Sequence, residues 1–365
     1  MPVLDRYIIR SISAAVLVVM TALLALLAVF LFINEQGWVG VGRYGNLQAL
    51  RFVALQLPTL LFEFLPVGIL VGSLLSLGAL ARHGELTVFR AAGVSNARLG
   101  LSVFMAGLLA VPVALLVGEY AGPPLARMAR VNKAIERNGE ISLAGRSGAW
   151  VRDGNLVLRA SGNPDGDARG KVQVFEIGTG NRLASVGAGG QTRELDENQW
   201  ELRDYSWTAF AADHVDFGSE TAHALQSRVS PAFFSLMQAD PGELSLRELR
   251  RTAQYLRDNG QDARAFRFAF WSDVARLAAI PFAALLALPF LLGSRRLTET
   301  GARATLGLVL GLVWFILQRV VESGTMALRL EPLLLAWMPT LLLMATVLLL
   351  FARLGIRRPR TITSA

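Results

Sequence analysis

The chain has 365 residues, of which 53% are hydrophobic and only 18% are charged, against about 25% charged residues in an average soluble domain. This composition excludes a disordered chain and disfavours an ordinary soluble enzyme. The net charge of +8 is uneven: residues 131–265 carry −3, which leaves +11 for the more apolar remainder. A basic surplus beside apolar segments is typical of a membrane protein and gives no support for nucleic-acid binding. The absence of cysteine excludes disulfides and thiolate chemistry.

Six apolar segments are long enough to cross a bilayer, which takes about 20 residues. They lie at 11–33, 60–81, 99–118, 273–292, 304–322 and 333–352. The first is longer than the apolar part of a signal peptide, so we expect it to remain in the protein as a helix. The sequence therefore predicts a helical membrane protein with three spans on each side of a polar middle region.

The short loops carry arginine on one side of the predicted membrane. Twelve arginines flank one set of span ends, whereas only Arg43, Arg51, Arg319 and Arg329 flank the other. The twelve are Arg6, Arg10, Arg82, Arg90, Arg98, Arg295, Arg296, Arg303, Arg353, Arg357, Arg358 and Arg360. By the positive-inside rule, both termini lie in the cytoplasm and the middle region lies outside, in the periplasm of a bacterium.

The cytoplasmic loop after the second span contains a short predicted helix. Leu86, Phe89 and Ala92 fall on one helical face, Glu85 lies in the first turn, and Gly93 can cap the end. We expect no hydrophobic core of this chain to receive that apolar face in the cytoplasm. The helix can lie on the bilayer surface or dock into a groove of a soluble partner, and its residues alone favour neither.

A row of basic residues follows the third span on its outer side. Its members, at helical spacing, are Arg127, Arg130, Lys133 and Arg137. Guanidinium groups bind phosphate bidentately and an ammonium group binds it as a point charge, so a phosphorylated lipid head group would suit this row. The alternative is a solvated stripe that Glu136 and Glu140 partly neutralise, and the two interpretations are equally supported.

The middle region, residues 134–240, is predicted to be a β domain. The pair Asp153-Gly154 is typical of a tight hairpin. Segments 171–177 and 200–207 show partial period-two alternation, which favours a sandwich or roll of short strands. In the following segment, 241–265, Ser245 and Glu248 form a capping-box signature before an amphipathic helix that ends at Asn259-Gly260 and returns the chain to the membrane.

The common catalytic constellations are missing from the sequence. There is no P-loop motif, so we do not expect this chain to hydrolyse ATP, and no H-E-x-x-H or G-x-S-x-G motif is present. We expect no metal site and no bound cofactor. Glu63 is expected to be an interfacial carboxylate with a structural role, and Asp273 and Arg276 to form a local ion pair near the outer end of the fourth span.

Several short fragments, in this order, carry a resemblance that extends over essentially the whole chain. They are Leu4-Asp5-Arg6-Tyr7-Ile8, Glu85-Leu86-Thr87-Val88 with Ala92-Gly93, Gly118-Glu119 with Met128-Ala129-Arg130, Trp150-Val151-Arg152-Asp153-Gly154-Asn155, and Gly260-Gln261-Asp262-Ala263 before Trp271-Ser272. In these fragments and their spacing the chain resembles the LptF/LptG family of lipopolysaccharide-export permeases. The resemblance implies an inner-membrane subunit of an ABC transporter that extracts lipopolysaccharide and passes it to a periplasmic bridge.

The resemblance also implies partners and a domain plan. The partners are a second, LptF-like permease, an LptB-like ATPase dimer that binds the ATP and Mg²⁺, and an LptC-like bridge protein. The implied plan is spans one to three over 1–133, a jellyroll-like β domain over 134–240, the return helix over 241–265 and spans four to six over 266–365. Within the first part, a coupling helix occupies about residues 84–93. The first and fifth spans would line a lateral gate for the lipid.

Site residues follow from the resemblance as well. Glu85 matches the coupling-helix glutamate and, with Leu86, Phe89 and Arg90, would contact the ATPase. Arg130 and Lys133 match basic positions near the cavity mouth, where lipid A phosphates are expected. The further candidates for phosphate contacts are Arg127, Arg43 and Arg319.

One departure from the family concerns the end of the first span. Relatives can carry lysines there, whereas this chain has Asn34, Glu35, Gln36 and Gly37. Arg43, Arg51 or Arg319 are the candidates to replace them. Two alternatives to lipopolysaccharide export remain at this stage: an ABC permease for another lipid or for lipoproteins, and a non-transporting envelope scaffold or sensor.

Overall fold

The chain divides into two compact units. The computed structural model describes residues 3–138, 149–161, 171–178, 182–189, 191–196, 199–211, 213–227, 240–293, 300–327 and 331–356. The first unit consists of Met1–Leu31, Gln56–Pro123 and Arg267–Ala365, and the second of Phe32–Leu55 and Pro124–Phe266. Of the arginines on which the predicted orientation rests, those at positions 295, 296, 329, 357, 358 and 360 lie outside the described residues.

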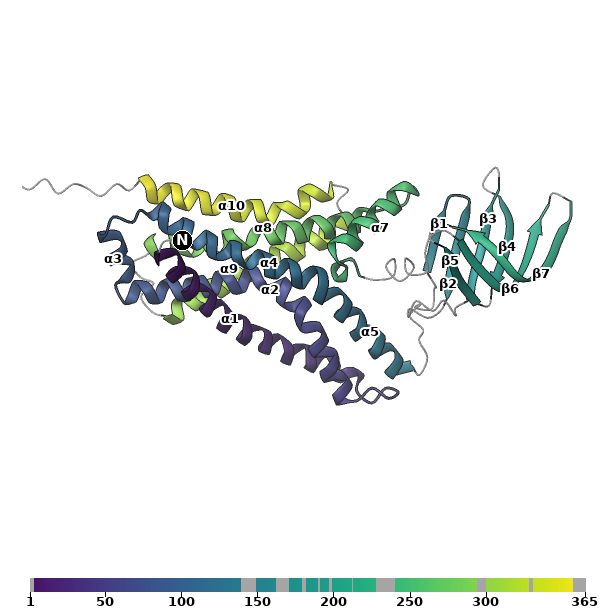
Figure 1. Cartoon of the computed structure of the whole chain (residues 1–365), viewed down its shortest axis with the longest axis horizontal. Coiled ribbons are helices and arrows are strands. Elements are labelled where there is room, and N and C mark those ends of the chain that lie inside the picture. Colours follow the sequence, from purple (N-terminus) through teal and green to yellow (C-terminus); the bar gives the residue numbers. More distant parts are fainter. Residues whose placement is uncertain are drawn as a thin grey trace, which may run out of the picture. The chain divides into compact units, whose positions relative to one another are not determined.

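Most of the described residues outside the middle region are helical (Figure 1). In chain order the elements are α1 (Val3–Glu35), the 3₁₀ helix η1 (Gln36–Trp38), α2 (Asn46–Arg82), α3 (Glu85–Ala91), α4 (Asn96–Leu116), the π-helical turn η2 (Val117–Ala121), α5 (Gly122–Asn138), the 3₁₀ helix η3 (Pro241–Glu243), α7 (Leu246–Asp258), α8 (Arg264–Gly293), α9 (Thr300–Ala327) and α10 (Pro332–Ile356).

Within the described ranges, five helical stretches are long and apolar enough to cross a membrane. They correspond to α1, α2, the continuous run of α4 and α5, α8 and α10. The predicted span at 304–322 falls in α9, whose apolar stretch Thr305–Val321 is shorter than the other five. The predicted helical architecture is thus confirmed with five candidate spans, and the sixth span stays a prediction.

Small residues bring α1 and α2 close together. Gly68, Gly72 and Ser76 are spaced four apart on α2, which places them on one face. A Cβ on Gly72 would lie 2.7 Å from the Cα of Val16, and the hydroxyls of Ser76 and Ser11 are 2.9 Å apart. Small residues at this spacing let membrane helices approach closely and pack by van der Waals contact.

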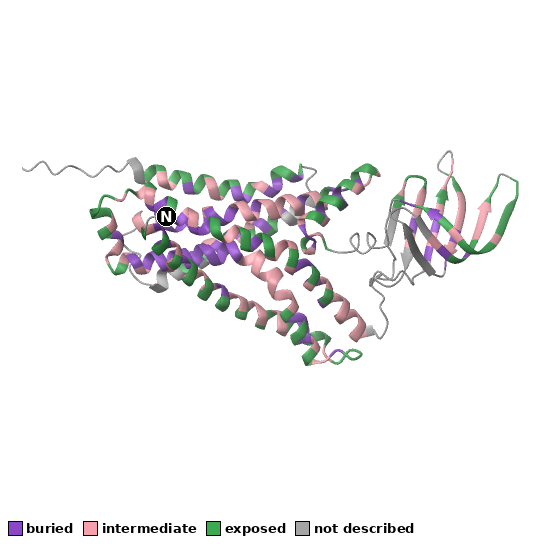
Figure 2. Ribbon diagram, in the orientation of Figure 1, coloured by how far each residue is buried: buried purple, intermediate pink, exposed green. Residues whose placement is uncertain are grey.

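The remainder of α1 has few contacts within its own chain. Only 6% of its most apolar window is buried, against 78% for α2. Leu17, Leu26 and Phe30 are among its exposed residues, and Figure 2 shows exposed positions, in green, along α1. The first span is therefore held mainly along one narrow seam.

The described residues of the middle region include an antiparallel sheet. Its strands are β1 (Ala149–Asp153), β2 (Leu156–Ser161), β3 (Lys171–Ile177), β4 (Leu183–Gly189), β5 (Gln191–Asp196), β6 (Gln199–Phe210) and β7 (Val215–Gln226). Their order is β1-β2-β3-β4-β6-β5, and β7 pairs with β6. The prediction of an all-β domain is confirmed in this coarse form, whereas the jellyroll stays a prediction.

The predicted first hairpin is present, but its turn is displaced by one residue. Asp153 pairs with Leu156, so the two loop residues are Gly154 and Asn155, and Asp153 belongs to the strand. Gly154 has φ +60°, the conformation that the first position of a II′ turn requires. Alternating side chains such as Val172 and Val174 form the core of the sheet.

The packing of α1 against α2 yields a stability prediction. Gly72→Val would force a Cβ into the Val16 backbone, so we expect the free energy of unfolding to fall by about 1–3 kcal/mol, the usual cost of overpacking. Thermal unfolding in detergent, followed by tryptophan fluorescence, measures the loss. Gly37→Val is the matched control, because a Cβ there meets no atom within 4 Å. Equal unfolding midpoints for both variants would contradict the close packing of α1 against α2 at Gly72.

Candidate functional site

The predicted coupling helix is α3, a short helix in the first unit. Gly84 precedes it with φ +76°, and Gly93 follows it with φ +87°. The N–H of Gly93 donates to the carbonyl of Arg90 and the N–H of Val94 donates to that of Phe89, both at 3.0 Å. These two bonds form a Schellman cap, so the predicted role of Gly93 is confirmed.

The apolar face of α3 packs into the chain's own core. Leu86 is only 5% exposed and belongs to the main apolar cluster of the first unit, and Phe89 packs against that cluster. The expectation that no core of this chain receives this face is therefore wrong. The cluster contains residues of α1, α2, α4, α8 and α10. Thr87, Val88 and Arg90 are exposed instead.

Glu85 begins α3 and is half-buried. Its Oε2 accepts a hydrogen bond of 2.8 Å from the hydroxyl of Tyr7 in α1. A carboxylate has several acceptor sites, so Glu85 can also accept a donor from a partner. The coupling role of Glu85, Leu86, Phe89 and Arg90 stays a prediction, with Glu85 and Arg90 on the accessible side.

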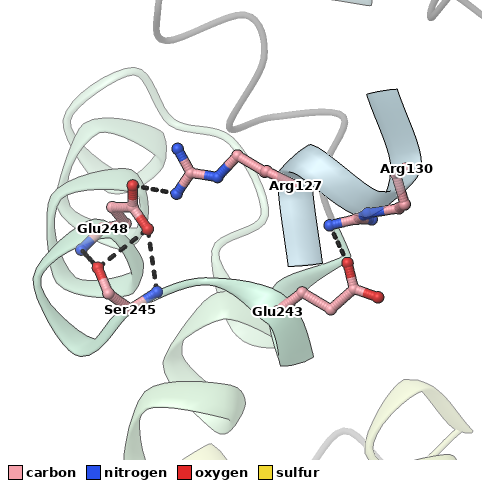
Figure 3. A network of polar contacts seen from close by, with 5 residues as sticks. All are labelled: Arg127, Arg130, Glu243, Ser245 and Glu248. Carbon is pink, nitrogen blue, oxygen red and sulfur yellow. Dashed lines mark hydrogen bonds and ion pairs between the residues drawn. The ribbon is translucent and has the colours of Figure 1, made fainter. Parts of the chain in front are cut away.

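In the second unit, the predicted basic row lies on α5, and its first two members are paired with carboxylates. Arg127 forms an ion pair with Glu248 in α7, and Arg130 forms one with Glu243 in η3 (Figure 3). Ser245 also donates to Glu248, from its backbone nitrogen at 3.0 Å and its hydroxyl at 2.9 Å. The predicted capping box is thus confirmed, and its glutamate serves both α7 and α5.

Lys133 lies in a more enclosed part of the same row. Its Nζ is 2.7 Å from both carboxylate oxygens of Glu35, and the Glu35 side chain is only 4% exposed. Tyr44 donates a 2.9 Å hydrogen bond to the same carboxylate. Burial, followed by this bond, raises the pKa of the Tyr44 hydroxyl above its usual range. The Lys133 Nζ also lies 4.7 Å from the ring centroid of Phe52, within cation–π range.

A cavity of about 90 Å³ adjoins Lys133. Its polar lining includes Gln48 and Arg51 from α2 and Asn132 and Lys133 from α5, and Glu136 supplies a negative charge. Among the described residues, the buried amide nitrogen of Asn132 has no hydrogen-bond partner. Since Lys133 is already paired with Glu35, the charges of Arg51 and Glu136 balance each other, and the Asn132 amide is an unused donor beside the cavity.

Two further predicted contacts, Arg43 and Arg319, belong to different units. The exposed Arg43 lies in the second unit, where its backbone N–H donates to the carbonyl of Glu136 at 2.6 Å. Arg319 lies in the first unit and pairs with Glu63. The predicted local pair of Asp273 and Arg276 is confirmed at 2.6 Å. The phosphate contacts themselves stay predictions.

Sequence reasoning did not identify the carboxylates that neutralise α5. It named Glu136, which lies on the same helix, and Glu140, which lies outside the described residues, as partly neutralising the row. The observed partners, Glu35, Glu243 and Glu248, are about 100 residues or more away in sequence. The capping-box motif marked Glu248 as ordered, but no pattern in the sequence connects it with Arg127.

The contacts of Glu248 make stability depend on pH. Burial alone raises the pKa of the Glu248 carboxyl, but the Ser245 N–H and the Arg127 guanidinium outweigh it, so the pKa lies below its usual value. The carboxylate therefore stabilises the fold fully above the unfolded pKa of about 4.3. This contribution is lost as the pH falls through the lower, folded pKa.

We expect Glu248→Gln to unfold more easily than the wild type at pH 7, by about 1 kcal/mol. Glutamine can still complete the capping box, so the change isolates the charge. Thermal unfolding of both proteins between pH 7 and pH 3 should show the difference shrinking at the acid end. Glu176→Gln, at an exposed site on β3, is the control. A difference that is independent of pH would contradict the role of the charge.

Comparison of the sequence with known proteins identifies a family. The family described as "Lipopolysaccharide export system permease LptF/LptG" matches residues 6–353. The chain is 26% identical to the LptG permease protein of Haemophilus influenzae over 351 residues, which cover 96% of this chain and 98% of that protein. It is 27% identical to LptG of Escherichia coli K12 over 340 residues, 93% of this chain and 94% of the relative. The chain belongs to the LptF/LptG family of lipopolysaccharide export permeases.

Proposed function

We propose that this chain is the permease subunit of an ABC transporter that takes lipopolysaccharide from the inner membrane and delivers it to a periplasmic bridge. The observation that carries the proposal is the family match, which extends over nearly the whole chain. Family and apolar helices together make it a multi-pass protein of the inner membrane. The arginine asymmetry of the loops supports cytoplasmic termini and a periplasmic β domain.

The energy source in this proposal is a separate, LptB-like ATPase dimer that binds the ATP and Mg²⁺. Its contact on this chain is α3. The half-buried Glu85 and the exposed Thr87, Val88 and Arg90 provide polar and apolar groups for such a partner. Because Leu86 and Phe89 pack into the core, a displacement of α3 by a partner on its exposed face is transmitted to the spans.

A second, LptF-like permease and an LptC-like protein complete the membrane part. The support lies in α1, whose most apolar window is only 6% buried within this chain. Partner helices or lipid must cover that surface in a bilayer, and the predicted lateral gate uses the same span. The fifth predicted span, in α9, also exposes apolar side chains, among them Leu312 and Ile316.

The head-group contacts are proposed to be Arg127, Arg130 and Lys133 on α5. Arg43, in the same unit, and Arg319, in the other unit, are further candidates. The α5 cations already hold carboxylates, so a phosphate binds by exchange. Phosphate offers more acceptor oxygens and a larger charge than a carboxylate, and it can be bound bidentately by arginine. Arg51 and Asn132 in the adjoining cavity are suitable additional donors.

The β domain is proposed to be the jellyroll-like element that receives the lipid. At one end of the β6–β7 hairpin, Phe210, Val215 and Phe217 are exposed, Phe217 by 82%. Within the strands that the structure describes, β7 pairs with β6 alone. An open edge beside apolar side chains supports addition of a strand from a bridge protein.

The coupling proposal predicts the effect of Glu85→Ala. We expect the purified transporter, reconstituted in vesicles with its ATPase, to lose at least about tenfold in lipopolysaccharide release per ATP hydrolysed, within the usual range of coupling energies. The variant should remain folded, because Leu86 and the Schellman cap of α3 are unchanged.

Glu176→Ala is the matched control, since it removes an exposed glutamate from the β domain. Wild-type release by Glu85→Ala would contradict the coupling role. If the wild-type chain purifies with the ATPase but releases a different lipid, the transporter mechanism stands and the cargo is wrong. If it purifies without an ATPase, the scaffold alternative is favoured.

The head-group proposal predicts weaker lipid contact after loss of the α5 charges. Lys133→Glu would place a second carboxylate beside that of buried Glu35, so neutral variants are preferable. We expect Arg130→Gln combined with Glu35→Gln and Lys133→Gln to lower lipopolysaccharide photo-crosslinking from position 128, an exposed site on α5, about tenfold. Arg264→Gln, which removes an exposed paired arginine, is the control. Unchanged crosslinking would assign the row to a structural role.

A further inference from the structure

The first two turns of α1 contact the coupling helix directly. The hydroxyl of Tyr7 donates to Glu85 at 2.8 Å. The Tyr7 ring also meets the Phe89 ring edge-on, with 6.5 Å between centroids and 73° between planes. Tyr7 therefore touches both the first turn of α3 and its inward aromatic residue.

Asp5 attaches the same part of α1 to α4. Its side chain accepts hydrogen bonds from Arg98 at 2.7 Å and from Ser102 at 2.6 Å, and the residue is 8% exposed. Arg98 lies in the first turn of α4, immediately after the loop that ends α3. Asp5 and Tyr7, two residues apart, thus contact α4 and α3 respectively, the two helices on either side of this loop.

The chain connectivity makes these contacts significant. Along the backbone, α3 is joined to α2 and α4, whereas α1 is separated from it by the whole of α2. A displacement of α3 reaches α1 through side-chain contacts rather than through the backbone. Because α1 is a continuous helix of 33 residues, about 50 Å long, a small tilt at its inner end produces a larger movement at its outer end.

We propose that Tyr7 and Asp5 are positioning residues that join the coupling helix to the first span, so that a movement of α3 driven by the ATPase tilts α1. The inference rests on the proposed function, in which α3 contacts the ATPase. It adds the route by which the movement reaches α1, whose most apolar window is the least buried among the five candidate spans. Glu85 thereby has two roles, as the partner contact and as the acceptor for Tyr7.

Tyr7→Phe tests the contact between α1 and α3 that Tyr7 and Asp5 provide, here called the joint. The change removes the hydroxyl and leaves the ring against Phe89, and because Tyr7 is 44% exposed the fold should be retained. In the reconstituted transporter we expect ATP hydrolysis to continue while lipopolysaccharide released per ATP falls about fivefold, the low end of typical coupling between sites. Asp5→Asn, which keeps an acceptor for Ser102 and removes the charge facing Arg98, should act in the same direction.

A distance measurement separates positioning from simple stabilisation. The chain contains no cysteine, so Leu17→Cys on α1 and Ala91→Cys at the end of α3 give a pair of spin labels at exposed sites outside the proposed ATPase contact. We expect ATP to change the distance between them in the otherwise wild-type chain, and Tyr7→Phe to reduce that change. Ser11→Ala is the matched control, since it removes an α1 hydroxyl bonded to α2 rather than to α3.

Each outcome decides one question. Wild-type release and an unaltered distance change in Tyr7→Phe would overturn the joint, as would an equal loss in Ser11→Ala. If Glu85→Ala loses release while Tyr7→Phe does not, the joint fails and the proposed function stands. If Glu85→Ala also behaves as wild type, the ATPase contact fails and the joint fails with it.

Discussion

The ion pair between Lys133 and Glu35 is the most buried ion pair among the described residues of the second unit. A lysine with 17% of its side chain exposed would be strongly destabilising without an anion, and Glu35, at 4%, would be equally so without a cation. Each makes the burial of the other possible, and the Tyr44 hydroxyl satisfies part of the remaining acceptor capacity. The pair thereby attaches the last residue of α1 to α5 and orders the turn between α1 and α2.

The first span is therefore a helix with polar attachments at both ends and an apolar middle. At its N-terminal end Asp5 and Tyr7 contact α4 and α3, and at its C-terminal end Glu35 contacts α5. Between them, the seam with Gly68 and Gly72 is narrow and most of the apolar surface is left to partners or lipid. A helix held in this way can tilt without breaking a hydrophobic core, since little of its middle surface takes part in one.

The sequence predicted those features that depend on local chemistry. Apolar length indicated the spans, Ser245 and Glu248 indicated the start of α7, and Gly93 indicated the end of α3. It did not predict which surface would receive Leu86, because a local apolar stripe does not reveal whether a core lies beside it. It also missed the partners of the α5 cations, since ion pairs between distant segments depend on tertiary packing. The shift of the first hairpin by one residue has a local cause: Gly154 alone meets the positive φ of the turn.

The burial of the three α5 pairs indicates how an incoming phosphate would meet them. Arg127 with Glu248 and Arg130 with Glu243 have side chains that are 24–37% exposed, whereas Lys133 and Glu35 are 17% and 4% exposed. Opening a pair leaves its carboxylate without a partner, and the penalty grows as that carboxylate is withdrawn from water. Glu248 keeps its bonds to Ser245 when Arg127 leaves, which lowers the penalty further. Exchange with phosphate is therefore least costly at Arg127 and Arg130 and most costly at Lys133.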